Sequence, residues 1–221
     1  MNQCIIIANG DLPKKSDINY LRNNGFDTLI CADGGANSTY KLDLIPDIVI
    51  GDLDSIRDDV KEYYSREQVP IKLIKRQNDT DVEKCIKYAI NNNCKRAVLL
   101  GATGDRLDHS FCNIGITLKY FDKIRIDILH QKSFLSAYNG KIVLETDKGE
   151  TISIYGVSNI TKFSSKGLKY PLKLASLAFG LKESTSNVAM GKEIELIIKQ
   201  GPGLVIRDFK VMRDNGFLFK S

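Results

Sequence analysis

The chain has 221 residues and a net charge of +5, which comes from scattered Lys and Arg residues rather than from one basic block. This length allows one large domain or two modest ones, and the 43% hydrophobic and 27% charged residues are ordinary for a globular protein. The composition argues against a nucleic-acid-binding arm, and no apolar run approaches the roughly 20 residues of a membrane span.

The first part of the chain alternates between two hydrophobic periodicities. Apolar runs bounded by Gly, Pro or Asp predict buried strands at 4–8, 28–32, 48–50, 71–74, 97–100 and 124–129. Helical spacing predicts helices between several of them, most clearly over 80–91, where Thr80 and Glu83 form a capping box. A second helical pattern runs from Leu107 to Leu118. Alternating strands and helices predict a mostly parallel sheet with helices on both sides.

After about residue 130, short alternating segments replace the helical pattern. Strands are predicted at 141–145, 151–155, 193–199 and 204–209. A Gln-Gly-Pro-Gly sequence at 200–203 separates the last two, which predicts a hairpin. We therefore expect an α/β domain over residues 1–130, followed by a C-terminal all-β sandwich domain over 131–221, with the boundary between 125 and 140.

Glycine- and aspartate-rich segments follow two neighbouring predicted strands, at 28–32 and 48–50. The carboxyl ends of parallel strands meet where open α/β sheets hold their ligands. After the first strand comes Asp33-Gly34-Gly35-Ala36-Asn37, whose glycines would let backbone N–H groups approach a phosphate at a helix N-terminus. A tight strand-to-helix turn without a ligand explains this segment equally well.

The second strand is followed by Gly51-Asp52-Leu53-Asp54-Ser55. In an extended backbone, Asp52 and Asp54 would point the same way and Leu53 the opposite way. Two carboxylates side by side suit a magnesium ion that shares its other positions with water and phosphate. Alternatively, Asp54 or Ser55 is the N-cap of the next helix. Since a cap explains only one acidic residue, the metal interpretation is favoured.

Two further strand ends carry polar residues. Thr80 and Asp81 begin the clearest helix, where the helix dipole alone would favour a carboxylate. The run 101–104, Gly-Ala-Thr-Gly, precedes Arg106 and Asp108, and the planar guanidinium of arginine suits phosphate oxygens. A glycine-containing turn with a surface Arg–Asp pair is the alternative. Together, four strand ends would bring glycines, carboxylates and one arginine to a single rim.

In this order and spacing, the motifs resemble the thiamine pyrophosphokinase family. The resemblance extends over essentially the whole chain, because Leu177-Ala178-Phe179-Gly180 and Ser184-Thr185-Ser186-Asn187 are similar to the family's thiamine-pocket segment. It implies transfer of the pyrophosphoryl group of ATP to the hydroxyl of thiamine, giving thiamine diphosphate and AMP. It also implies a homodimer with active sites at the subunit interface.

The resemblance further implies roles for individual residues. The magnesium ligands would be Asp52, Asp54 and Asp81. The residues around ATP would be Asp33, Gly34, Gly35, Asn37, Ser55, Gln77, Thr80, Gly104 and Arg106. The catalytic set would be Asp52, Asp54, Asp81, Arg106 and Asp108. Apart from the resemblance, we favour an aspartate near the metal, Asp54 or Asp81, as acceptor of the hydroxyl proton. The thiamine-binding residues would be Ser184, Ser186 and Asn187.

Two other classes of function stay open. One is a different magnesium-dependent transferase that uses a nucleotide, such as a nucleotide-sugar transferase, which would give no role to residues 184–187. The other is a non-catalytic nucleotide sensor, which would not need Arg106 and Asp108 beside a full set of metal ligands.

The cysteines indicate a cellular compartment. There are five, an odd number without Cys-x-x-Cys spacing, which fits a reducing cytosol better than a disulfide framework. The N-terminus runs into an apolar segment without a basic, signal-like start. We therefore expect a cytoplasmic protein.

Overall fold

The computed structural model describes residues 2–75, 78–104 and 106–219. The chain divides into two compact units, Met1–Gln131 and Lys132–Ser221, each of which is described by itself. Within the described ranges, no helix is long and apolar enough to cross a membrane.

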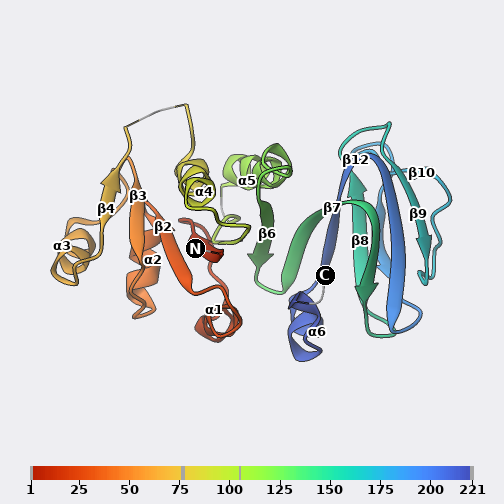
Figure 1. Cartoon of the computed structure of the whole chain (residues 1–221), viewed down its shortest axis with the longest axis horizontal. Helices are drawn as coiled ribbons and strands as arrows, with labels where there is room; N and C mark the ends of the chain where they lie inside the picture. The colour runs from red at the N-terminus through yellow and green to blue at the C-terminus, as the bar shows by residue number, and fades with distance from the viewer. Residues whose placement is uncertain (1, 76–77, 105, 220–221) are drawn as a thin grey trace. The chain divides into compact units, whose positions relative to one another are not determined.

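The first unit is built on a parallel sheet with strand order β6-β5-β1-β2-β3-β4 (Figure 1). Its strands are β1 (Gln3–Ile7), β2 (Thr28–Ala32), β3 (Ile48–Gly51), β4 (Ile71–Leu73), β5 (Arg96–Leu100) and β6 (Arg125–His130). Its helices are α1 (Lys15–Arg22), α2 (Gly35–Lys41), α3 (Asp58–Arg66), α4 (Asp81–Asn91) and α5 (Leu107–Lys119). The predicted α/β architecture is confirmed.

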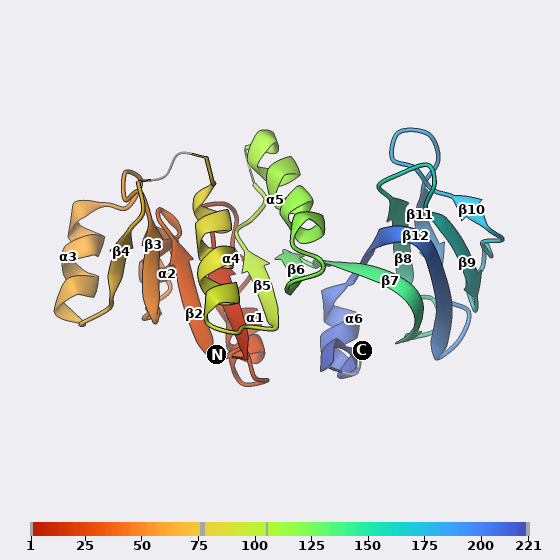
Figure 2. The same cartoon turned by 45° about the horizontal axis from the view of Figure 1, so that its top comes forward.

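The direction of the crossovers distributes the helices over both faces of this sheet. From β1 to β4 the chain moves steadily toward one edge, and it then returns across the sheet to β5 and β6. Because such crossovers are right-handed, α1 to α3 lie on one face and α4 and α5 on the other (Figure 2). Coverage of both faces explains why Ile5, Ile6, Leu29 and Val98 are all fully buried.

Two helices differ in detail from their sequence patterns. At the start of α4, the Thr80 hydroxyl accepts the Glu83 N–H at 3.2 Å, which is half of the predicted capping box. The Glu83 carboxylate instead accepts hydrogen bonds from Lys119 and Tyr120 of the neighbouring segment. In α5, Leu107 is 68% exposed, because this helix buries its other side.

The second unit is β-rich, as predicted. Its strands are β7 (Ser133–Glu145), β8 (Thr151–Gly156), β9 (Lys162–Lys166), β10 (Ala175–Ser176), β11 (Ser184–Val188) and β12 (Glu193–Asp208). A short helix, α6 (Phe209–Asp214), and a 3-10 turn (Phe217–Phe219) follow β12, so the unit is not strictly all-β. The N-cap of this helix is Asp208, whose carboxylate accepts the Val211 N–H.

The predicted hairpin at 200–203 is wrong. Residues 193–208 form one continuous strand, β12, and both of its halves pair antiparallel with β7. Gln200 and Gly201 have positive φ values of 63° and 122°, so they form a bulge between Ile198 and Gly203 instead of a chain reversal.

The bulge separates two halves of β12 that pair with different strands besides β7. The first half of β12 also pairs with β9, and its second half pairs with β8. The buried core of this unit draws on both halves and includes Leu144, Ile152, Ile154, Phe163, Leu177, Ile194, Leu196 and Val205. These contacts form a sandwich-like core from strands that bend rather than from separate hairpins.

Candidate active site

A cavity of about 520 Å³ lies at the carboxyl edge of the parallel sheet in the first unit. Residues from the ends of β1, β2, β3 and β5 and from the start of α4 line it. The edge includes the boundary between β1 and β5, where the direction of the crossovers reverses. Open α/β sheets bind ligands at such topological switch points.

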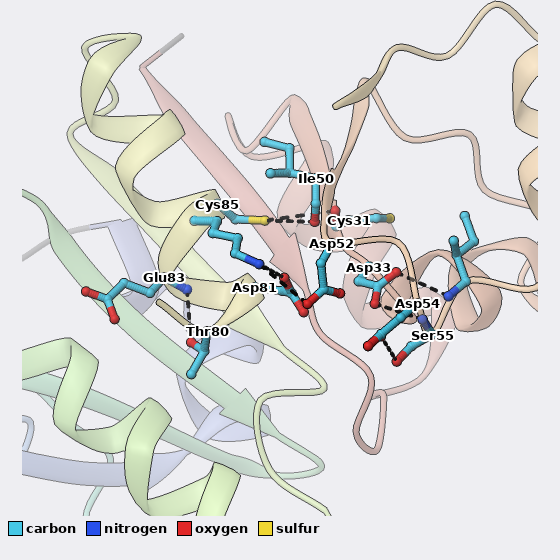
Figure 3. Close-up of polar contacts among 12 residues, drawn as sticks. Cys31, Asp33, Ile50, Asp52, Asp54, Ser55, Thr80, Asp81, Glu83 and Cys85 are labelled. Atoms are coloured by element: carbon cyan, nitrogen blue, oxygen red, sulfur yellow. Dashed lines mark hydrogen bonds and ion pairs between the residues drawn. The ribbon is translucent and has the colours of Figure 1, made fainter. Parts of the chain in front are cut away.

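Three carboxylates form an acidic cluster in this cavity (Figure 3). Asp33, Asp52 and Asp81 each offer an oxygen atom, and these atoms lie within 4.8 Å of one another. Asp52 Oδ1 is buried without a hydrogen-bond partner among the described residues. A buried, unpaired carboxylate oxygen is costly, and a hard divalent cation is the kind of ligand that would satisfy it. The acidic cluster therefore fits a metal ion.

Lys84 supplies positive charge to the acidic cluster. Its side chain is almost fully buried, and Nζ lies 2.7 Å from Asp81 Oδ1 and 3.9 Å from Asp52 Oδ2. Sequence reasoning missed this residue, although its position three residues after Asp81 in the first turns of α4 was a usable signal. Lys84 holds two carboxylates together that would otherwise repel each other.

Asp33 anchors the loop that carries Asp52. Its two oxygens accept the backbone N–H groups of Ser55 and Ile56, at 3.0 and 3.1 Å. Burial raises the pKa of Asp33, an effect that the Ser55 N–H opposes and the nearby charge of Asp81 reinforces. Asn37 supports the same loop, because its side chain donates to the Ser55 carbonyl and accepts the Arg57 N–H.

The extended backbone expected at 52–54 is not found. Strand β3 ends at Gly51, and Leu53 has a φ of 64°, so the alternation that would put Asp52 and Asp54 on one side does not operate. Asp54 is exposed, and its pKa is lowered mainly by the hydrogen bond that the Ser55 hydroxyl donates to it. Neither Asp54 nor Ser55 caps α3, whose N-cap is Arg57.

The glycines here are required by close packing. A Cβ on Gly35 would lie 2.2 Å from the Ile7 carbonyl oxygen, and one on Gly51 would lie 2.6 Å from the Asp33 Cβ. Gly35 therefore lets the start of α2 pack against β1, independently of any ligand. Gly34 lines the cavity itself.

Arg106 and Asp108 form a two-point ion pair at the start of α5. Arg106 Nη2 lies 2.6 Å from Asp108 Oδ2, and Nε lies 3.2 Å from Oδ1. The guanidinium holds the pKa of Asp108 below its usual value. Both side chains are exposed, so the pair contributes little to stability and can open at low cost.

The segment predicted to bind thiamine is strand β11 of the second unit. Asn187 is buried, and its side-chain amide is used within this unit: it donates to the Tyr170 carbonyl and to the Ser184 hydroxyl, and accepts the Tyr170 and Val188 N–H groups. Ser186 has a positive φ of 55°, and its N–H donates to the Ser153 hydroxyl.

The predicted site residues thus fall into several groups. Those that line the cavity are Asp33, Gly34, Asp52, Ser55, Thr80, Asp81, Gly104 and Arg106. Four other residues that were predicted to bind ATP or metal or to be catalytic do not line the cavity: Gly35, Asn37, Asp54 and Asp108. Gln77 lies outside the described residues.

Further lining residues were not predicted from the sequence. Besides Lys84, they include Asn9, Gly10 and Asn113. Asn9 and Gly10 directly follow β1, so the strand-end rule that identified the other loops would have found them too. Asn113, on α5, donates to the Ala102 carbonyl at 2.7 Å and so fixes the loop after β5. No local sequence pattern indicates this contact.

Two family models match most of the chain. Residues 21–128 match "Thiamin pyrophosphokinase, catalytic domain", and residues 140–201 match "Thiamin pyrophosphokinase, vitamin B1 binding domain". The chain is also 30% identical over 195 residues to thiamine pyrophosphokinase 2 of Oryza sativa subsp. japonica, covering 75% of this chain and 72% of the rice protein.

Solved structures agree with the fold. The thiamine pyrophosphokinase of Bacillus subtilis matches 94% of this chain and 99% of its own, with a TM-score of 0.81 and 21% identity. That of Geobacillus thermodenitrificans matches 94% of this chain and 97% of its own, with a TM-score of 0.77 and 26% identity. With both family models matched in chain order, the chain belongs to the thiamine pyrophosphokinase family.

Proposed function

We propose that this chain transfers the pyrophosphoryl group of ATP to the hydroxyl of thiamine, giving thiamine diphosphate and AMP. The observation that carries the proposal is the acidic cluster with Lys84 in a cavity at the carboxyl edge of the sheet. Transfer of this kind needs little covalent chemistry from the protein. It needs positioned reactants and stabilisation of charge on the phosphates.

Asp52, Asp54 and Asp81 would hold the proposed cofactor, Mg²⁺. The unpaired Oδ1 of Asp52 supports its part in this assignment, and Asp81 belongs to the same acidic cluster. Asp54 follows two residues later in the loop that carries Asp52. Asp33 would act chiefly by fixing the loop 52–56, because backbone N–H groups already occupy its oxygens. When bound, the ion would neutralise charge that develops on the phosphate oxygens.

Lys84 and Arg106 are the cationic groups that would face the phosphates. Lys84 is held in the cavity by Asp81 and can share its remaining N–H donors with a phosphate oxygen. Arg106 lines the cavity, and its guanidinium is held by an exposed ion pair with Asp108. A phosphate can take the place of Asp108 in this pair at little cost. Gly34 and Gly104 would allow the backbone to approach the nucleotide closely.

Residues 1–130 would bind ATP and metal, and residues 131–221 would bind thiamine and form the homodimer. In this assignment Ser184 and Ser186 contact thiamine, and Asn187 holds their strand in place. Thiamine's cationic ring would tolerate the acidic rim, which would repel an anionic acceptor.

Sedimentation tests the homodimer with its active sites at the subunit interface, because a monomer with full activity would contradict it.

A cytoplasmic location is also proposed. All five cysteines are free, which supports a reducing compartment. Fractionation of the source cells tests the location, and recovery of the protein in an exported fraction would contradict it.

Product analysis tests the proposed reaction. The protein is incubated with ATP, Mg²⁺ and thiamine, and the nucleotides and thiamine esters are then separated. Equal amounts of AMP and thiamine diphosphate are expected. ADP with thiamine monophosphate would mean transfer of the γ-phosphoryl group alone and would contradict the proposal. Binding of ATP without turnover would favour a nucleotide sensor.

A further inference from the structure

Two buried cysteines are in contact at the amino-terminal ends of the strands in the first unit's sheet. Cys4 lies in β1 and Cys94 in the turn between α4 and β5, and their Sγ atoms are 3.4 Å apart. Cys4 is fully buried and Cys94 is 2% exposed. The Lys95 N–H donates to the Asn2 carbonyl at 2.9 Å, which holds this turn against the start of β1.

The Cys94 thiol also contacts the Arg96 carbonyl at 3.1 Å and the Asn2 carbonyl at 3.5 Å, so what distinguishes it is the neighbouring Cys4 sulfur. The Cys31 sulfur contacts the Thr39 hydroxyl, and the Cys85 thiol points toward main-chain carbonyls. Cys112 is exposed on α5. The pair Cys4 and Cys94 therefore combines thiol–thiol contact with shielding from larger reagents.

A small oxidant can reach this pair through the turn that covers it. Residues 91–93 are exposed, and Asn93 reverses the chain with a φ of 61°. Cys94 is the next residue in the chain, so this buried side chain directly follows an exposed turn. Local opening of a surface turn costs far less than global unfolding and would admit a molecule of the size of water.

We propose that Cys4 and Cys94 are a peroxide-sensitive dithiol that oxidises to an intramolecular disulfide. The Cys94 sulfur attacks one oxygen of hydrogen peroxide, the O–O bond breaks, and sulfenic acid and water form. The Cys4 sulfur then attacks the Cys94 sulfur, and the hydroxyl leaves as a second water with the Cys4 proton. Overall, two thiols lose two hydrogen atoms and one peroxide becomes two waters.

The position of the pair predicts what the disulfide does. The pair lies at the amino-terminal ends of β1 and β5, whereas the cavity lies at the carboxyl ends of these strands. The disulfide would link residues that are 90 positions apart in the sequence. It would therefore reduce the conformational entropy of the unfolded chain and stabilise the fold. We expect it to raise the melting temperature of the protein by about 5–10 °C and to leave turnover unchanged.

The test uses the full chain carrying Cys112→Ser, so that the exposed thiol cannot form intermolecular bonds. The protein is treated with hydrogen peroxide, remaining thiols are alkylated under denaturing conditions, and non-reduced peptides are identified by mass spectrometry. A linked peptide pair containing Cys4 and Cys94 is expected, with the loss of two hydrogen atoms, and with Cys31 and Cys85 still alkylated. The rise in melting temperature should disappear after treatment with dithiothreitol.

Alkylation of both Cys4 and Cys94 after peroxide treatment would overturn the proposal, and so would oxidation of Cys94 to sulfinic acid without a cross-link. Adding Cys94→Ser to the same background should abolish both the linked peptide and the change in melting temperature. Should that variant fold poorly, the peptide map of the protein with both cysteines decides the matter alone. None of these outcomes depends on the proposed transferase activity.

Discussion

In the first unit the predicted site residues come from loops at the ends of parallel strands, whereas in the second unit they lie within a paired strand, β11. The loops leave polar atoms available, such as the unpaired Oδ1 of Asp52. In β11, the buried Asn187 amide is instead fully used by its own unit. Unpaired buried atoms indicate a place for a ligand, whereas a saturated amide indicates that the residue fixes the backbone.

The largest expected effect is that of Asp52→Asn in the first unit. This change removes a charge from the acidic cluster, so kcat/KM should fall at least about 1,000-fold while the melting temperature stays nearly constant. Steady-state kinetics and thermal unfolding measure the two quantities. Asp58→Asn, at an exposed acid in the first turn of α3, is the matched control and should retain activity. Near-normal activity of Asp52→Asn would mean that the metal assignment is wrong.

Lys84→Met should reduce turnover by about 100-fold, because it removes a cation that faces the phosphates. It also leaves Asp52 and Asp81 without their internal counter-charge, which should lower the free energy of unfolding by about 2 kcal/mol in the absence of metal. Adding Mg²⁺ should restore more stability to this variant than to the unmodified protein. An equal thermal shift in both proteins would show that Lys84 and the metal do not share these carboxylates.

Asn187→Ala in the second unit should raise the KM for thiamine about tenfold and leave the KM for ATP unchanged, because lost hydrogen bonds loosen the strand that carries Ser184 and Ser186. Thr185→Ala, at an exposed neighbour, is the control and should have little effect. If the melting temperature falls but both KM values stay constant, the strand has only a structural role.

The smallest expected effect concerns the pH dependence of stability at Glu83. Burial alone would raise its pKa, but hydrogen bonds from Lys119 and Tyr120 lower the pKa below the ordinary value. The charged form therefore stabilises the fold above the ordinary carboxyl pKa of about 4.3, and this contribution is lost as the pH falls through the lowered pKa.

We expect Glu83→Gln to lower the free energy of unfolding by about 1–2 kcal/mol at neutral pH, and the difference to shrink in acid. Urea unfolding across this range measures it, with Glu67→Gln at an exposed site as the control. A difference that does not change between neutral and acidic pH would exclude the charge of Glu83 as its cause.

The sequence predicted the first unit well because its signals are local. Apolar runs that end in Gly or Asp identify buried parallel strands, and topology then requires their ends to meet at one edge. Asp52, Asp81 and Arg106 were found in this way. The left-handed backbone at Leu53 and the capture of the Ser55 N–H by Asp33 were not predictable, because they depend on a contact between loops distant in sequence.

The second unit was harder to predict for a physical reason. A bulge and a hairpin turn share the same residues, Gln-Gly-Pro-Gly, and only the partner strand distinguishes them. Since β7 is long enough to pair with both halves of β12, the chain continues forward at Gln200. The saturated hydrogen bonds of Asn187 likewise depend on Tyr170, which no local pattern connects to it.

The most direct test of the acidic cluster is a crystal structure with Mn²⁺ and α,β-methylene-ATP, an analogue whose α–β linkage cannot be cleaved. We predict an anomalous peak for Mn²⁺ within coordination distance of Asp52 and Asp81, with the β- and γ-phosphates beside Lys84. A peak elsewhere, with both carboxylates still paired only to Lys84, would contradict the proposed metal site.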